Sequence, residues 1–531
     1  MSKELSNDLD AGRAVKEAEC IIRLNCQDDT LKMDTSDGGN ADAFVKLHGK
    51  KFLYVKQLGW LHWNEKYWEQ DDEAVMVAMR DSFDTRHDGF TRCGENEKAS
   101  QTKRNTYKME AAIKQAKSLL RKDIKEFDRN PDEINVDNGV LNLRTLELVP
   151  HDSSQLFTYC LRAPYDENAD MSSVEDFMAK VLTKEGEETN QELVDFIQTA
   201  LGYSLTGHTR EEKLFYMYGE LGRNGKGSIT EALMELVPYP ISMEVDFNTF
   251  TARRDGDSQN FDLADMKPSR MIFASESNKY QLLNPASIKK LTGGNYVRAA
   301  HKFKGFVTYR PQFKTWLSSN HKVNGDPDEH VMWNRVLVIE FPNSYQGRED
   351  TLLKDLLKSP EVQKGLLRWA AIGTKRWYEQ GLHVPEQVKL ATKKHQADVD
   401  TFSNWLDDAT RPEKNHFVLN SAIYQNYKVW CEANGITPKG SYQFSEAMKL
   451  RGQERGFEKA RTTDKQRARG YRGLRIVTEY RMIQGEKYLL EVDLDPESDT
   501  PLRNPSPVPP TPPVDDNDED TPFEDHDDEM W

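Results

Sequence analysis

A glycine-rich turn between an apolar run and a helical pattern is the feature of this sequence that most directly indicates chemistry. Residues 213–218 have the composition of a buried strand, and residues 229–237 follow the spacing of an amphipathic helix. Glycines let backbone N–H groups turn inward around phosphates, and the start of a helix adds the positive end of its dipole. The candidate ATP-binding residues are Gly219, Gly222, Asn224, Gly225, Lys226, Gly227 and Ser228.

Lys226 and Ser228 carry the side chains that a bound nucleoside triphosphate needs. The ammonium of Lys226 would reach the β- and γ-phosphates, and the hydroxyl of Ser228 would hold Mg²⁺. The spacing is unusual, because Glu220 stands where a P-loop has its first glycine and Gly219 comes one place earlier. The Gly-Lys-Gly-Ser ending resembles that of nucleoside monophosphate kinases, so the motif alone does not separate a kinase from a motor. An ordinary glycine-rich turn is the plainer alternative.

Three polar residues further along the chain adjoin apolar runs. Glu276 ends one run and could order Mg²⁺, and Asn320 ends the next and could hold the attacking water. Arg335 precedes a third run and could act as an arginine finger on the ATP of a neighbouring subunit. The plainer alternatives are turn residues for the first two and a surface ion pair, for example with Asp328, for Arg335. Their order along the chain favours an ATPase.

These segments resemble the core of the superfamily 3 helicases, and more narrowly the phage and plasmid primase-helicases related to the poxvirus helicase-primase. The segments that carry the resemblance are 261–276, 290–294, 316–322 and 333–341, with further matches at 37–44, 60–68 and 138–151. The resemblance implies a ring-forming AAA+-like ATPase, usually a hexamer, that uses ATP and Mg²⁺ to move along single-stranded DNA. It makes Glu276 the Walker B acid, Asn320 the sensor and Arg335 the finger acting in trans. Asn295 and Ala300 depart from the Asp and Arg that the family usually has.

Two basic clusters are candidates for DNA contacts. The first lies between the strands that end at Glu276 and Asn320, where a pore hairpin is expected at about 298–305. Lysines would attract phosphates and nearby aromatic side chains could stack on bases. The second lies in a hairpin predicted after two helices, which suggests a winged-helix module for duplex DNA. The candidate DNA-binding residues are Arg298, His301, Lys302, Lys304, Lys465, Arg467 and Arg469. Solvated basic loops are the alternative.

Net charge and hydropathy limit the class of protein. The chain has 531 residues and a net charge of −16. Residues 495–531 hold 13 acidic residues and one arginine, so they carry −12 and leave the rest of the chain at only −4. Neither an apolar signal core nor a run of roughly 18 apolar residues occurs, so we expect a cytoplasmic protein (of a host cell, if phage-encoded) without a membrane segment. The acidic tail could bind a replication partner or simply aid solubility.

The predicted fold is a multidomain α/β protein with an AAA+-like P-loop ATPase core, an N-terminal α+β domain, a C-terminal winged-helix-like module and a disordered acidic tail. The expected divisions are a poorly ordered segment at 1–40, the α+β domain at 41–150, a helical collar or linker at 151–205, the ATPase at 206–345, a helical segment at 346–400, the winged-helix-like module at 401–485 and the tail at 486–531.

The function that this organisation favours is an ATP-dependent DNA helicase of phage or plasmid replication, acting as a ring oligomer on single-stranded and duplex DNA. Primase chemistry is not expected, because the N-terminal part lacks a convincing Asp-x-Asp strand for paired metal ions. Two alternatives stay open. An ATP-switched origin-binding or loader protein would bind duplex DNA without unwinding it. A P-loop kinase of small molecules would turn over nucleotide independently of DNA.

Overall fold

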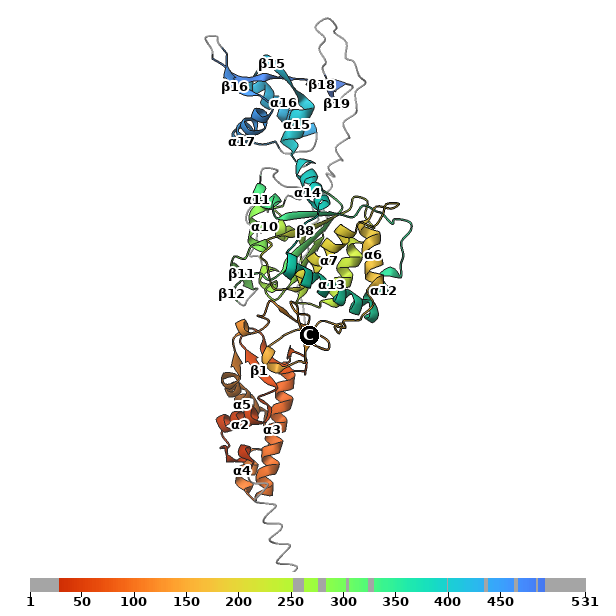
Figure 1. Ribbon diagram of the computed structural model, residues 1–531. Helices are drawn as coiled ribbons and strands as arrows, with labels where there is room; N and C mark the ends of the chain where they lie inside the picture. The colour runs from red at the N-terminus through yellow and green to blue at the C-terminus, as the bar shows by residue number, and fades with distance from the viewer. Residues whose placement is uncertain are drawn as a thin grey trace, which may run out of the picture. The chain divides into compact units, whose positions relative to one another are not determined.

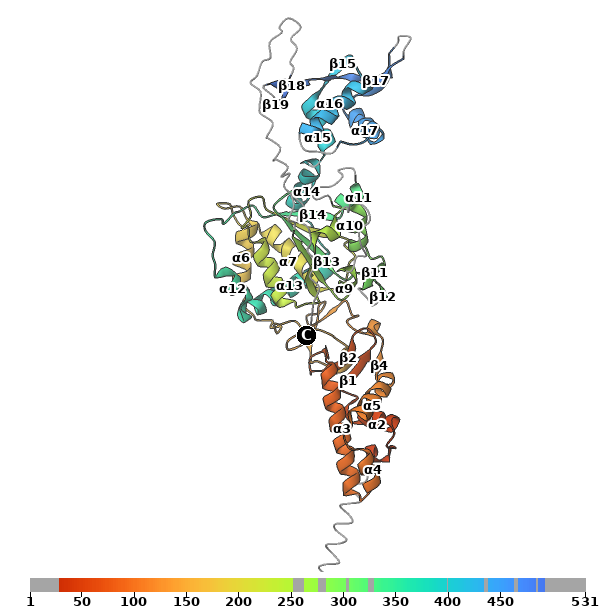
Figure 2. The same ribbon diagram turned by 180° about the vertical axis from the view of Figure 1, so that it is seen from behind.

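The computed structural model describes residues 28–251, 262–275, 283–301, 305–322, 329–398, 400–433, 438–462, 467–483 and 486–491. The chain divides into two compact units, Met1–Val399 and Asp400–Trp531. Figures 1 and 2 show the elements of each unit from opposite sides. Mixed α/β structure is confirmed in the described residues of both units.

The first unit begins with helices packed on a small sheet. The helices are α2 (Asp37–His48), α3 (Asp72–Arg92), α4 (Asn96–Gln101) and α5 (Thr106–Leu119), and the strands are β1 (Phe52–Val55), β2 (Gly59–Trp63), β3 (Trp68–Gln70) and β4 (Arg121–Lys122). The sheet has the order β3-β2-β1-β4, in which β1 runs antiparallel to β2 and parallel to β4. Trp60 and Trp68 are buried, so they serve packing.

Local capping explains where this region differs from the predicted elements. The apolar spacing over 101–127 predicts one helix, but α5 begins after Asn105, whose side chain accepts a hydrogen bond from the Lys108 N–H, and ends at Leu119. The first 40 residues were expected to be poorly ordered, yet α2 already begins at Asp37. Ser36 caps it by accepting a hydrogen bond from the Gly39 N–H.

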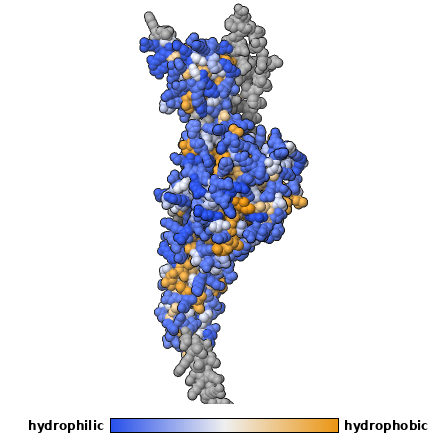
Figure 3. Space-filling view, in the orientation of Figure 1, coloured by the Kyte–Doolittle hydropathy of each residue, from blue (hydrophilic) through white to orange (hydrophobic). Residues whose placement is uncertain are grey.

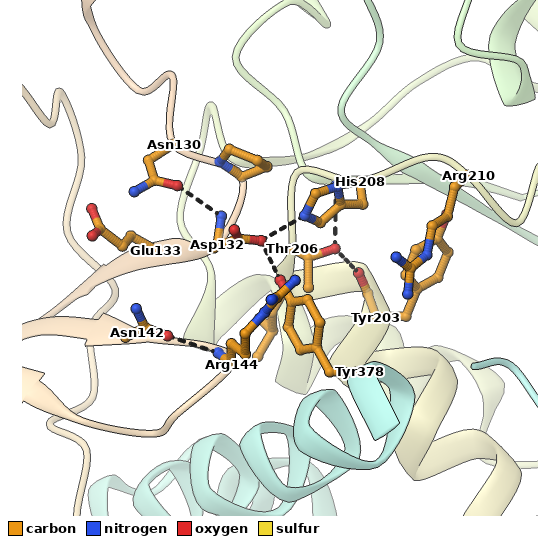
Figure 4. Close-up of polar contacts among 12 residues, drawn as sticks. Asn130, Asp132, Glu133, Asn142, Arg144, Tyr203, Thr206, His208, Arg210 and Tyr378 are labelled. Atoms are coloured by element: carbon orange, nitrogen blue, oxygen red, sulfur yellow. Dashed lines mark hydrogen bonds and ion pairs between the residues drawn. The ribbon is translucent and has the colours of Figure 1, made fainter. Parts of the chain in front are cut away.

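A three-stranded sheet of hairpins follows, with β5 (Glu133–Val136), β6 (Gly139–Asn142) and β7 (Leu148–Val149) in sequential order. A polar cluster joins it to the rest of the unit (Figure 4). Oδ1 of Asp132 accepts hydrogen bonds from His208 Nε2 over 2.6 Å and from the Tyr378 hydroxyl over 2.5 Å. The guanidinium of Arg144 stacks over the ring of Tyr378 at 4.8 Å. Asp132 therefore ties the hairpins to two segments that are distant in sequence.

A parallel sheet forms the centre of the first unit. Its strands are β8 (Leu214–Tyr218), β9 (Ser242–Glu244), β10 (Met271–Ser275), β13 (Lys314–Ser319) and β14 (Val336–Glu340). They are hydrogen-bonded in the order β14-β8-β13-β10-β9, and every pair is parallel. Alternate side chains of β8 enter two different cores, with Phe215 in one and Leu214 in the other. The sheet is therefore covered on both faces, as a parallel sheet requires.

Helices cover the two faces of this sheet. One core includes α6 (Ser172–Leu182), α7 (Gln191–Leu205), α8 (Lys226–Leu236), α12 (Leu353–Lys358) and α13 (Pro360–Gln380), and the other includes α9 (Asp262–Asp265), α10 (Pro285–Thr292) and α11 (His330–Trp333). The segment 151–205 is expected to be a helical collar or linker. Within it, α7 is buried nearly all round and packs against α13 and the sheet. A helix that is apolar all round needs partners on every side.

Strand β14 lies at an edge of the sheet, and α14 (Glu386–Asp398) covers it. The hydroxyl of Thr392 accepts a hydrogen bond from the Val338 N–H over 3.0 Å, so it satisfies a donor that would otherwise face solvent. The remaining strands of the first unit, β11 (Val297–His301) and β12 (Gly305–Tyr309), form an antiparallel hairpin, whose first strand contacts α9. Short 3-10 helices occur at Asp29–Lys32, Ile124–Glu126, Ser153–Gln155 and Phe247–Phe250.

The second unit combines helices with an antiparallel sheet. Its helices are α15 (Thr401–Ala409), α16 (Asn420–Ala433), α17 (Ser441–Ala447) and a π-helix at Met448–Gly452, and its strands are β15 (Thr410–Leu419), β16 (Glu458–Arg461), β17 (Arg469–Ile476), β18 (Thr478–Ile483) and β19 (Glu486–Glu491). Strand β17 lies between β15 and β16, and β18 pairs with β19. The tail was expected to be disordered from 486, but 486–491 form β19, which the hydrophobic run Tyr488 to Leu490 favours. Residues 492–531 lie outside the described residues.

The mean hydropathy of the chain is −0.79, which predicts a mostly hydrophilic surface. Figure 3 shows a face that is mostly hydrophilic, with small hydrophobic areas between. Among the described residues, no helix combines the length and apolar composition that crossing a bilayer requires.

Candidate active site

The glycine-rich turn lies between β8 and α8, as the sequence predicts. Gly222 and Gly225 have φ angles of +67° and +91°, which residues with a Cβ rarely adopt. A Cβ on Gly225 would also lie 2.6 Å from Cγ1 of Val181. Because Gly225 is the residue before α8, its backbone sets the direction in which the helix starts. The turn can therefore approach a ligand closely, and the N–H groups of the first turn of α8 remain available to an anion.

Lys226 is the first residue of α8, and its side chain is only 5% exposed. Its ammonium donates hydrogen bonds to the Gly219 carbonyl over 3.2 Å, to Asn224 Oδ1 over 2.6 Å and to Asn320 Oδ1 over 3.0 Å. Burial lowers the pKa of Lys226 to about 8. All three acceptors are neutral, so none of them compensates the charge of the lysine. A buried cation without a compensating anion is suited to bind a phosphate.

The segment that follows β14 makes hydrogen bonds with the glycine-rich turn and supports its conformation. Asn224 Nδ2 donates to the Asn343 carbonyl over 3.2 Å, the Ser344 hydroxyl donates to the Gly222 carbonyl over 3.0 Å, and the Tyr345 N–H donates to the Arg223 carbonyl over 3.0 Å. This support cannot be predicted from the sequence, because three polar residues after a strand are typical of any loop.

The carboxyl ends of neighbouring parallel strands meet beside the turn. Asn320 follows β13 directly, and its side chain is exposed apart from its bond to Lys226. Strand β10 is the next strand and ends at Ser275, which is paired in register with Ser318. Glu276, the expected acid, lies outside the described residues. The sheet thus brings Lys226 and Asn320 together, at the edge where β10 also ends.

Ser228 and Gly227 lie in the first turn of α8. Gly227 is exposed and a Cβ there would meet open space, while Ser228 is partly exposed. In the part of the chain that the structure describes, no group of three or more His, Cys, Asp or Glu side chains could hold a metal ion.

Arg335 lies at the amino ends of the parallel strands, whereas Lys226 and Asn320 lie at their carboxyl ends. It precedes β14, whose first residue Val336 is paired with Leu214, the first residue of β8. The turn containing Lys226 follows the other end of β8, so a five-residue strand, roughly 15 Å, separates the two. Nη2 of Arg335 contacts Glu212 Oε2 at 2.5 Å and Nη1 donates to the Val331 carbonyl over 3.1 Å. Arg335 therefore does not reach the phosphate cradle of its own chain.

Four of the seven predicted DNA-binding residues are among the described residues, and they lie in or beside two pairs of antiparallel strands. Arg298 is exposed on β11, and His301 is the last residue of that strand, although the side chain of His301 lies outside the described residues. Lys302 and Lys304 lie outside them as well. In the second unit, Arg467 and Arg469 are exposed where β17 begins, and Lys465 lies outside the described residues.

Two family models match this chain. Residues 41–183 match the model described as "D5 N terminal like", and residues 217–335 match a model described as a family of unknown function. The second match begins in β8 and ends at Arg335, so it contains the glycine-rich turn, Asn320 and the hairpin of β11 and β12.

Two curated viral proteins are similar to this chain. "Putative helicase L207/L206" of Acanthamoeba polyphaga mimivirus is 24% identical over 341 residues, which are 59% of this chain and 34% of the viral protein. "Putative helicase 022R" of Frog virus 3 (isolate Goorha) is 22% identical over 299 residues, which are 52% of this chain and 29% of the viral protein. The chain spans about a third of the length of these relatives.

Among solved structures, apo forms of the C-terminal region of NrS-1 are similar to this chain. The A form aligns at 10% identity with a TM-score of 0.46, covering 81% of this chain and 98% of that one. A shorter piece, residues 305–718 of that protein, aligns at 11% identity with a TM-score of 0.39, covering 59% and 78%.

Proposed function

We propose that the chain is a member of the phage and viral superfamily 3 primase-helicase family and an ATP-dependent DNA helicase of replication, which its similarity to the "D5 N terminal like" model and to two viral putative helicases supports. It couples ATP hydrolysis to translocation on single-stranded DNA and works as a ring, with a hexamer as the expected form. The observation that carries the proposal is the division of one sheet between two roles. Lys226 and Asn320 lie together at the carboxyl ends of the parallel strands, and Arg335 lies at the amino ends.

ATP fits the cradle at the carboxyl edge. The triphosphate takes the place of the neutral oxygens around the Lys226 ammonium, which gains an anionic partner in a site with little water. The first-turn N–H groups of α8 hold phosphate oxygens, and Ser228 and Glu276 hold Mg²⁺. When bound, Mg²⁺ neutralises charge on the β- and γ-phosphates. Asn320, released from Lys226, orients the attacking water.

Arg335 serves the ATP of the adjoining subunit. A finger must present its guanidinium to the charge that develops on the transferred phosphoryl group, and in its own chain Arg335 is a strand length from the cradle. In a head-to-tail ring, the amino ends of the strands in one subunit can face the carboxyl ends of the strands in the next subunit. Glu212 is the positioning residue, because its contact with Nη2 fixes the direction of the arginine side chain.

DNA contacts are assigned to two places. Arg298 and His301 belong to β11, and Lys302 and Lys304 come between β11 and β12 in the sequence. The position of β11 and β12 in the chain between β10 and β13 couples them to the strands that end at the nucleotide. The second unit binds duplex DNA with Lys465, Arg467 and Arg469. The order helix, strand, two helices and two strands supports a winged-helix-like module.

A strand-displacement assay tests the proposal. The full chain should displace a labelled strand from a forked duplex with ATP and Mg²⁺, and both Lys226→Ala and Arg335→Ala should abolish displacement. A protein that binds duplex DNA in an ATP-dependent manner but never displaces a strand would be a loader instead. ATP turnover unchanged by DNA, in a monomer, would support a kinase.

A further inference from the structure

A cavity in the first unit lies far along the chain from the nucleotide cradle. It has a volume of about 300 Å³ and is lined by Lys56, Gln57, Arg121, Lys122 and Asp123. It forms where β1 and β4 run parallel with Val55 paired to Lys122, so both strands end at the same edge. The residues that follow them, Lys56 and Asp123, therefore come side by side. Three of the five lining side chains are cationic.

Two of these cations have no side-chain partner among the residues that the structure describes. Lys56 and Arg121 are exposed, and within the described residues neither makes an ion pair or a side-chain hydrogen bond. Lys122 contacts Glu126 at 3.2 Å, and that pair is about 40% exposed on each side, so it is worth little. The cavity thus presents uncompensated positive charge to solvent.

Neighbouring cations extend this charge. The ammonium of Lys117 lies 4.9 Å from the centre of the Tyr54 ring, and Tyr54 is the register partner of Arg121. Asp123, the one acid in the lining, accepts a hydrogen bond from the Lys125 N–H, and its charge also acts on Lys267. Among the described residues, Asp123 forms no ion pair with Lys56 or Arg121, so the lining has three cations and one acid.

We propose that this cavity binds the phosphodiester backbone of single-stranded DNA, which gives the protein a DNA contact outside the ATPase core. The volume is at the lower end for ligand sites and admits about one nucleotide. Lysine and arginine without acidic partners bind phosphates independently of base sequence, and Arg121 can bind two oxygens of one phosphate. The choice of DNA rests on the proposed function, whereas an anionic ligand follows from the cavity itself.

Fluorescence anisotropy of the full chain with a labelled oligothymidylate, without ATP, tests this proposal. The charge reversal Lys56→Glu with Arg121→Glu should weaken binding at least about tenfold and lower the slope of log K against log salt concentration by roughly 1–2. The neutral pair Lys56→Gln with Arg121→Gln should weaken binding in the same direction by less. Circular dichroism and the thermal midpoint show whether each variant is folded.

The matched control is Arg92→Glu with Lys103→Glu. Both residues are exposed cations without side-chain partners among the described residues. Arg92 is the last residue of α3 and Lys103 follows α4, and α4 lies at the other end of this helical region from β1 (Figure 1). The control changes the net charge by the same amount, and we expect it to alter affinity by less than about twofold. Equal losses in both charge-reversed proteins, or no loss at the cavity, would overturn the proposal.

A competition arm distinguishes DNA from a small anion. If the charge-reversed cavity variant keeps its oligothymidylate affinity but loses binding of inorganic triphosphate, the cavity is a small-anion site and the proposal is wrong. The readout needs no ATP turnover. A wild-type protein that binds the oligonucleotide through this cavity but never unwinds would contradict the motor and leave the cavity assignment standing.

Discussion

The ammonium of Lys226 donates a hydrogen bond to Oδ1 of Asn320 over 3.0 Å, which joins the glycine-rich turn to the end of the neighbouring strand β13. The two residues are 94 positions apart in the chain. Without nucleotide, the amide oxygen is one of three neutral acceptors around a buried cation. A bound triphosphate would compete for that cation, so the occupancy of the cradle and the position of the Asn320 side chain are linked.

We expect Asn320→Ala to lower kcat for ATP hydrolysis by about 10²–10³-fold, while KM changes little, because the side chain acts on the attacking water and not on the bound phosphates. Steady-state ATPase assays with saturating single-stranded DNA measure both constants. An unchanged kcat with a raised KM would instead make Asn320 a nucleotide-binding residue.

The affinity for ATP should fall as pH rises through about 8. Burial lowers the pKa of Lys226 to about 8 from an ordinary 10.5, and only the protonated form attracts phosphates. The association constant should decrease by up to about tenfold per pH unit above 8, with proton uptake on binding. Without ligand the sign is reversed for stability, because between pH 8 and 10.5 the unfolded chain binds more protons and the folded state is favoured as pH rises.

Titration calorimetry in buffers of different ionisation enthalpy measures this proton uptake. Lys226→Arg is the control, because a guanidinium keeps its proton, and its affinity should not follow pH whatever its absolute value. Affinity that is constant for wild type between pH 7 and 9 would be inconsistent with a buried, uncompensated ammonium in the cradle.

Two neighbouring glycines give a matched test of the turn. Gly225→Ala should lower the free energy of unfolding by about 1–3 kcal/mol, because its φ is +91° and a Cβ would lie 2.6 Å from Val181. Gly227→Ala should be neutral or stabilising by up to about 1 kcal/mol, because it is helical and its Cβ would meet open space. Thermal or urea unfolding separates them. Equal effects would mean that the turn is not held in this conformation.

Glu212→Gln should lower kcat about tenfold and leave the Kd for ATP unchanged. The substitution keeps the shape of the side chain but removes the charge that holds Arg335, whose Nη2 lies 2.5 Å from Glu212 Oε2. Nucleotide binding by fluorescence titration and turnover by ATPase assay distinguish the two constants. A change in the Kd for ATP without a change in kcat would mean that Glu212 supports the structure of the nucleotide cradle and does not position Arg335.

The sequence predicts the local parts of the site well. Strand β8, the turn and helix α8 follow from an apolar run, glycines and helical spacing, and their observed bounds differ from the predicted ones by a few residues. The support of the turn by Asn343 and Ser344 was not predictable, because it depends on where β14 ends relative to a turn about 120 residues earlier in the chain. Long-range pairing of this kind has no periodic signature.

The packing partners of α7 could not be predicted from the sequence pattern either. A helix that is apolar on every side must be buried, but the pattern does not say against what, and the collar expected at 151–205 shares its core with α13 and the sheet. The polar joint at Asp132 is a similar case. Its two partners, His208 and Tyr378, lie far from Asp132 and from each other in the chain, and each alone is an ordinary surface residue type.

A mixing experiment tests the central claim, that one subunit supplies the cradle and the next supplies the arginine. Lys226→Ala and Arg335→Ala should each be inactive in DNA-stimulated ATP hydrolysis. In mixed rings, the intact cradle of one variant meets the intact arginine of the other, so we predict that mixing restores part of the activity. Mixing Lys226→Ala with the double variant should restore none. Activity that stays absent in mixed rings, with mixing verified by native mass spectrometry, would contradict the shared site.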